Sequence, residues 1–161
     1  MEYVSPQPNT FFTGKAKWIW SAEGLGGRCP DPRPIQCRYF RRSFDCPAGA
    51  GGQLAISADT CYMLWVNGRL LTRGPQKGDV AHQFYDTLDL TDDLVEGTNT
   101  ILVRVDCYAK TFSYTEPPAA PGSRMTAATV FVADGCIEDD YGEEILDLAT
   151  DARWEVRIDD A

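Results

Sequence analysis

The single histidine, His82, has the widest chemical repertoire of any residue in this 161-residue sequence. Histidine activates a serine or cysteine nucleophile when a third group orients the imidazole. No G-x-S-x-G elbow and no recognisable cysteine-nucleophile motif accompanies His82 in the sequence. The phosphate-binding patterns G-x-x-x-x-G-K and G-x-G-x-x-G are absent as well. We therefore interpret His82 as a loop residue rather than a catalytic base.

Carboxylates are the second source of chemistry, because the chain contains 24 Asp and Glu residues. Glycoside hydrolysis needs two carboxyl groups held about 5–10 Å apart. With so many acids the sequence does not select a pair, and no catalytic residue is predicted. Neither an H-E-x-x-H zinc pattern nor an EF-hand loop occurs. No cofactor is predicted, and a structural calcium ion held by scattered Asp oxygens is left open.

Aromatic side chains suggest a third chemistry, the binding of carbohydrate. Sugars stack their C–H faces on aromatic rings and pair their hydroxyl groups with planar polar side chains. We expect most aromatic residues, the tryptophans included, to fill the core. Two groups of candidate carbohydrate-contacting residues are expected in loops. One group follows a central hairpin, and the other follows a strand that ends at Cys107. The predicted carbohydrate contacts are Arg73, Asp79, His82, Tyr108, Phe112 and Tyr114.

Short strands separated by turns must position these residues. Alternating or apolar segments predict strands at 17–20, 36–45, 53–59, 61–66, 84–90, 100–107, 127–133 and 153–158, with a minor one at 145–148. Residues Thr91 to Glu96 have the pattern of one helical turn, with Thr91 as N-cap and Gly97 as its end.

The dipeptide Asn67-Gly68 lies between Trp65-Val66 and Leu70-Leu71. Both turn residues tolerate the positive φ of a type I′ turn, so a β-hairpin is predicted there. About eight short strands and 24 Gly and Pro residues then predict an all-β fold, an antiparallel β-sandwich of jelly-roll type. We expect an N-terminal tail at residues 1–15 and one sandwich domain at residues 16–161.

Proteins that bind nucleic acid usually carry net positive charge, whereas this chain has a net charge of −9. No nucleic-acid partner is therefore predicted. No apolar run approaches the ~18 residues that span a bilayer, so no membrane partner is predicted. The N-terminus has neither the basic nor the apolar region of a signal peptide, which favours the cytoplasm if that terminus is native. The six cysteines show no C-x-x-C spacing, and Cys61 and Cys107 fall within apolar strands, so we predict free thiols.

An ordered succession of segments gives this sequence a resemblance to a known family. The segments are Lys17-Trp18-Ile19-Trp20, Tyr39 to Phe44, Ala58-Asp59, Tyr62 to Gly68, Arg73-Gly74-Pro75, Tyr85-Asp86, Asp89-Leu90 and Gly97 to Ile101. From Lys17 to Trp154 the chain resembles the N-terminal β-sandwich domain of bacterial α-L-rhamnosidases.

The resemblance implies a galactose-binding-like accessory domain placed before a separate helical barrel that carries the catalytic carboxylates. Such a barrel exceeds 161 residues, so no catalytic residue is carried over to this chain. The implied function is carbohydrate binding or substrate orientation, with a rhamnose-containing glycan and the parent catalytic domain as partners. Two alternatives stay open, a packing module without its own ligand and a small stand-alone enzyme.

Overall fold

The part of the chain that the structure describes contains nine β-strands and one short 3₁₀ helix, joined by turns and loops. The computed structural model describes residues 15–21, 36–76, 84–107 and 130–159. The elements are β1 (Gln36–Cys46), β2 (Gly51–Asp59), β3 (Cys61–Val66), β4 (Arg69–Gly74), β5 (Asp86–Asp89), η2 (Thr91–Asp93), β6 (Gly97–Cys107), β7 (Val130–Glu138), β8 (Glu144–Asp147) and β9 (Glu155–Ile158).

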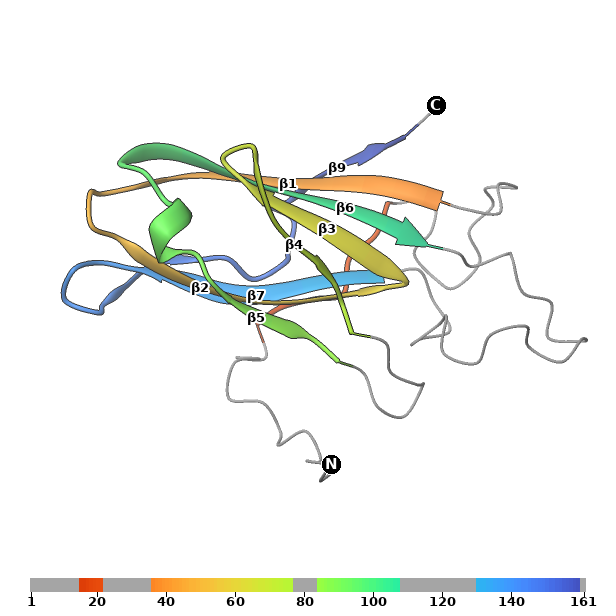
Figure 1. Cartoon of the computed structure of the whole chain (residues 1–161), viewed down its shortest axis with the longest axis horizontal. Helices are drawn as coiled ribbons and strands as arrows, with labels where there is room; N and C mark the ends of the chain where they lie inside the picture. Colours follow the sequence, from red (N-terminus) through yellow and green to blue (C-terminus); the bar gives the residue numbers. More distant parts are fainter. Residues whose placement is uncertain (1–14, 22–35, 77–83, 108–129, 160–161) are drawn as a thin grey trace, which may run out of the picture.

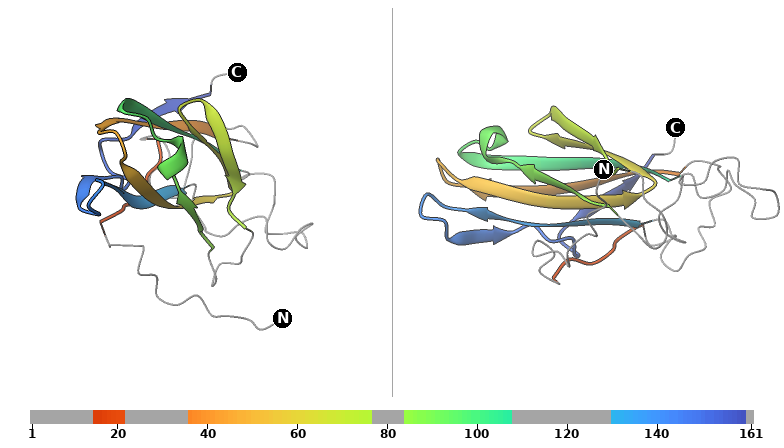
Figure 2. Two further views of the ribbon diagram at one scale, coloured as in Figure 1. Left: turned by 60° about the vertical axis from the view of Figure 1, so that its left-hand side comes forward. Right: turned by 60° about the horizontal axis from the view of Figure 1, so that its bottom comes forward.

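Two antiparallel sheets face each other as a sandwich (Figure 1). One sheet has five strands in the order β4-β3-β6-β1-β9, and the other has four in the order β5-β2-β7-β8. Figure 2 shows the two layers from two further directions. The short edge strand β9 pairs only with Arg38 to Arg41 of β1. The predicted all-β sandwich is confirmed.

The core lies between the sheets and is built by alternation along each strand. In β6, Ile101, Val103 and Val105 are fully buried, as the sequence pattern predicts. The ring of Phe131 in β7 lies 4.8 Å from that of Phe40 in β1, so aromatic packing joins the two sheets. Trp154 completes this cluster, with its ring 5.4 Å from that of Phe131.

The predicted hairpin at Asn67-Gly68 is confirmed by its backbone angles. Asn67 has φ +50° and Gly68 has φ +82°, and the turn joins Val66 of β3 to its partner Arg69 of β4. These positive angles match the type I′ turn, which suits the right-handed twist of the flanking strands.

Gly68→Val is expected to lower the free energy of unfolding by about 1–3 kcal/mol, because a β-branched residue is strained at positive φ. No atom lies within 4 Å of a Cβ built at Gly68, so backbone strain alone accounts for the effect. Thermal or urea unfolding measures it. Leu70→Val is the control, because it places a similar side chain two residues further on, in β4. Equal midpoints for the two variants would contradict the turn assignment.

A buried asparagine fastens this turn to the start of β6. The Asn99 side chain is fully buried and donates to the carbonyl oxygens of Val95 (2.7 Å) and Gly97 (2.9 Å). Its Oδ1 accepts from the Asn67 side chain (2.8 Å) and from the Val95 amide (2.9 Å). The Asn67 Oδ1 in turn accepts from the Thr100 amide (2.9 Å). Each donor and acceptor of the Asn99 amide group is therefore used.

Two predicted elements differ from the structure. Segment 17–20 is no strand: it forms one isolated bridge between Ile19 and Phe131, while the Lys17 amide donates to Thr150. These bonds go to different neighbours, so no ladder forms. The helical turn is the three-residue η2, whose N-cap is Leu90 rather than Thr91.

The expectation that the tryptophans fill the core is correct for Trp20 and Trp154, which are buried. It is wrong for Trp18, which is 43% exposed, and for the half-buried Trp65. Trp65 occupies an outward position of β3, where alternation places every second side chain. No helix in the described ranges has the length and hydropathy needed to cross a bilayer.

Candidate functional site

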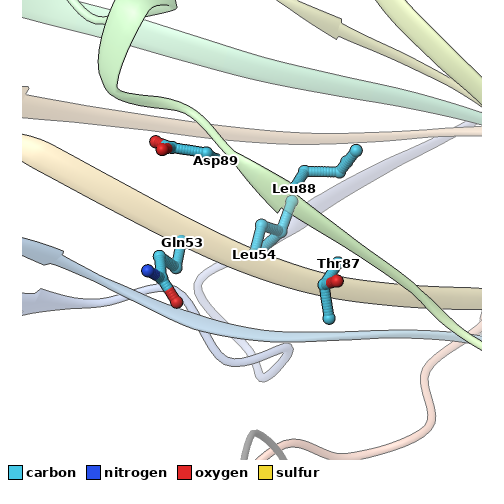
Figure 3. A pocket seen from close by; sticks show the side chains of 5 residues that line it. All are labelled: Gln53, Leu54, Thr87, Leu88 and Asp89. Atoms are coloured by element: carbon cyan, nitrogen blue, oxygen red, sulfur yellow. The ribbon is translucent and has the colours of Figure 1, made fainter.

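A hollow of about 260 Å³ lies at the β5 edge of the four-stranded sheet. Among the described residues it is lined by Gln53, Leu54, Thr87, Leu88 and Asp89. Gln53 pairs with Asp89, and Ala55 pairs with Thr87, so the antiparallel register of β2 and β5 places the polar positions on one face. Figure 3 shows Gln53 and Thr87 pointing to one side of the strands and Leu54 and Leu88 to the other.

The Asp89 carboxylate is fixed by the start of η2. Its Oδ1 accepts a hydrogen bond from the Thr91 amide at 3.0 Å. Hydrogen bonds from the Thr91 side chain and backbone hold the pKa of this carboxyl below its usual range, because they favour the charged form. At neutral pH the hollow therefore presents an ionised carboxylate, a primary amide and a hydroxyl group.

This set of groups fits the hydroxyls of a sugar, because an amide both donates and accepts while a carboxylate accepts strongly. Hydrolysis of a glycosidic bond needs a second carboxyl group at about 5–10 Å. Asp89 is the one carboxylate among the described lining residues. The described arrangement is thus suited to binding rather than to acid–base catalysis.

A buried tyrosine fixes β5 and so the position of the hollow. The Tyr62 hydroxyl, in the five-stranded sheet, donates to Asp86 of β5 in the other sheet at 2.5 Å. Burial first, and then Asp86, raises the pKa of Tyr62 far above its usual range, so the phenol stays neutral. Gly74 pairs with Tyr62, and a Cβ at Gly74 would collide with the Asp86 carboxylate. Asp86 therefore serves the fold, and its neighbour Thr87 faces the hollow.

Of the predicted contacts, only Arg73 lies within the described residues. Asp79, His82, Tyr108, Phe112 and Tyr114 lie outside them. Arg73 is exposed on β4, where it pairs with Met63 on the outer face of the five-stranded sheet. It does not line the hollow, which belongs to the opposite sheet. Sequence reasoning missed Gln53, Thr87 and Asp89, because outward polar residues also occur on other strands, such as β1 and β6.

The five cysteines in the described ranges form no disulfide, which agrees with the predicted thiols, and Cys29 lies outside these ranges. Burial, followed by Asp106, raises the pKa of Cys37 to about 12. Burial, followed by Glu138, raises the pKa of Cys136 to about 11. These two thiols therefore stay protonated near neutral pH and are poor nucleophiles.

Within the described residues no three His, Cys, Asp or Glu side chains are grouped to hold a metal ion, and calcium binding stays a prediction.

The fold and the hollow place this protein in the class of antiparallel, jelly-roll-like β-sandwiches with a polar depression at one sheet edge. No family model matches the chain. The chain is similar to an α-L-rhamnosidase of Streptomyces avermitilis, with 33% identity over 90 residues, which are 55% of this chain and 8% of that protein.

Solved structures extend the similarity. A GH78 family rhamnosidase of Bacillus sp. GL1 matches with a TM-score of 0.63 and 32% identity, over 89% of this chain and 13% of that one. A lectin of Pleurotus ostreatus shares the fold, with a TM-score of 0.63 and 20% identity, over 89% of this chain and 35% of the lectin. The predicted resemblance to a domain of α-L-rhamnosidases is confirmed. The chain spans 8% and 13% of the two rhamnosidases.

Proposed function

We propose that this chain is a non-catalytic accessory domain of an α-L-rhamnosidase-like glycoside hydrolase, and that it binds carbohydrate or orients substrate. The observation that carries the proposal is the grouping of Gln53, Thr87 and Asp89 around the hollow at the edge of the β2–β5 pair. Its partners are a rhamnose-containing glycan and the catalytic domain of the parent protein.

The size of the hollow limits the ligand. Its volume of about 260 Å³ lies just below the ~300–1,000 Å³ of sites for drug-sized ligands, and suits a single sugar ring. At about 0.3 kcal/mol per heavy atom, the eleven heavy atoms of rhamnose give ~3–4 kcal/mol of binding free energy. We therefore expect a dissociation constant in the millimolar range.

Titration of the chain with L-rhamnose is expected to shift the amide NMR signals of Gln53, Thr87 and Asp89 with a common millimolar Kd. Gln53→Ala and Asp89→Asn should each weaken binding about three- to tenfold, because each removes a polar contact worth ~1 kcal/mol. The matched controls are Gln76→Ala and Asp92→Asn, which alter exposed residues outside the described lining of the hollow.

The isolated chain should release no rhamnose from an aryl α-L-rhamnoside, and such release would contradict its non-catalytic role. Unshifted signals throughout the hollow at tens of millimolar rhamnose would favour a packing module without its own ligand. The same spectra report on Asp79, His82, Tyr108, Phe112 and Tyr114, which stay proposed contacts.

A further inference from the structure

One row of side chains crosses the outer face of the five-stranded sheet without a break. The strand registers place Arg157 of β9 beside Tyr39 of β1, and Tyr39 beside Arg104 of β6. They continue from Arg104 to Met63 of β3, and from Met63 to Arg73 of β4. We name these five residues the arginine row. Figure 1 shows β4, β3, β6, β1 and β9 in one layer of the sandwich.

The charge of this row contrasts with that of the molecule. The chain has a net charge of −9, yet the row contains three arginines and no carboxylate. Arg104 pairs with Asp106 on the next row, with Nε and Oδ1 3.0 Å apart. The arginines that pair with an acid within the described residues are Arg41, Arg69, Arg104 and Arg153. Binding of an anion by Arg73 or Arg157 therefore breaks no ion pair with a described residue.

Apolar side chains lie beside the charges. In the next row along the strands, Leu102 pairs with Trp65, and Trp65 pairs with Leu70, which is 40% exposed. Tyr39, Met63 and Trp65 are each half-buried, so part of each side chain faces solvent. Aromatic and thioether groups beside arginines can contact the C–H faces of sugar rings while the guanidinium groups bind acidic substituents.

The spacing of the arginines selects the ligand. They occupy alternate strands, and because neighbouring strands lie ~4.8 Å apart, successive arginine stems are about 10 Å apart. That distance is close to the length of two sugar rings in an extended glycan. We propose that the arginine row binds an anionic polysaccharide with a carboxylate on every second sugar, Tyr39 and Met63 packing against the rings between the carboxylates.

This assignment rests on the proposed function for the carbohydrate nature of the ligand, but uses a different face from the hollow. Nucleic acid fits less well, because its charges are far denser and the chain as a whole is acidic. A glycan with widely spaced charges can place its carboxylates at the arginines and away from Asp106 and Asp159, the acids that act on Tyr39.

The test measures binding of the chain to hyaluronan, which has one carboxylate per disaccharide, and to its neutral methyl ester. The acid form should bind and the ester should not, and raising the salt from about 0.1 M to about 1 M should abolish binding. The double variant Arg73→Gln/Arg157→Gln should bind about tenfold more weakly, through loss of two exposed charge contacts. The control Arg69→Gln/Arg153→Gln makes the same change in net charge outside the row and should bind as the unchanged chain does.

Equal binding of acid and ester, full affinity in the Arg73→Gln/Arg157→Gln variant, or no binding of hyaluronan would each overturn the proposal. A dimer of the free chain that this variant dissociates in sedimentation would assign the face to self-association instead. L-Rhamnose binding at Gln53, Thr87 and Asp89 is a separate readout. Its persistence alongside a failed hyaluronan test would remove the arginine row and leave the hollow.

Discussion

Phe131→Ala is expected to lower the free energy of unfolding by about 3–5 kcal/mol, which is typical of truncating a fully buried aromatic residue. Phe131 has no solvent exposure and touches both Phe40, across the sandwich, and Trp154. Its loss leaves a cavity between the sheets that rigid strands cannot close. Urea unfolding followed by tryptophan fluorescence measures the change.

Tyr141→Ala is the matched control, because this aromatic residue lies in the turn between β7 and β8 and is 90% exposed. Its effect should stay within ~0.5 kcal/mol. A loss below about 1 kcal/mol for Phe131→Ala would mean that the two sheets do not pack through this cluster.

Asn99→Leu is expected to destabilise the protein by about 3 kcal/mol, although leucine has a similar size. It removes the partner of the Val95 amide and carbonyl and of the Gly97 carbonyl, and one of the partners of the Asn67 side chain, which keeps its bonds to Asp93 and Thr100. Each unsatisfied buried group costs about 1–3 kcal/mol, and local relaxation recovers part of that cost. Thr98→Ala, at an exposed neighbouring position, should cost less than about 1 kcal/mol.

Asn99→Asp separates hydrogen bonding from packing. A carboxylate cannot donate to Val95 and Gly97, whereas the protonated acid regains one donor. Burial raises the pKa of such a group in the folded state, so stability should rise as the pH falls from about 7 to about 4. A flat pH dependence relative to the unchanged protein would contradict the donor role of Asn99.

Much of the sandwich could be predicted because strand alternation and turn chemistry are local. The pattern of β6 and the Asn67-Gly68 turn each depend on neighbouring residues and agree with the structure. The predicted strand at 17–20 was wrong because apolar residues are typical of a strand, whereas a ladder of hydrogen bonds also needs one continuous partner strand. The prediction of Thr91 as the N-cap was wrong. Asp89, two residues earlier, accepts the hydrogen bond of the Thr91 amide.

The hollow could not be predicted, because it depends on which strands become neighbours. Gln53 and Asp89 are 36 positions apart, and only the pairing of β2 with β5 brings them together. Arg73 is the opposite case, a predicted contact that does not line the hollow. Its type suggested a polar contact, but its location on the outer face of β4 became known only from the register with Met63.

The short strand β9 shields part of one edge of the five-stranded sheet. It has four residues, whereas its neighbour β1 has eleven, and it is the only cover on that side of β1 within the described sheet. Without Glu155 to Ile158, Arg38 to Arg41 of β1 would also lose their partner strand on this side, leaving backbone amides and carbonyls along the edge free to pair with another molecule. Protection of this edge against pairing with other molecules thus depends on a segment that adds almost nothing to the core.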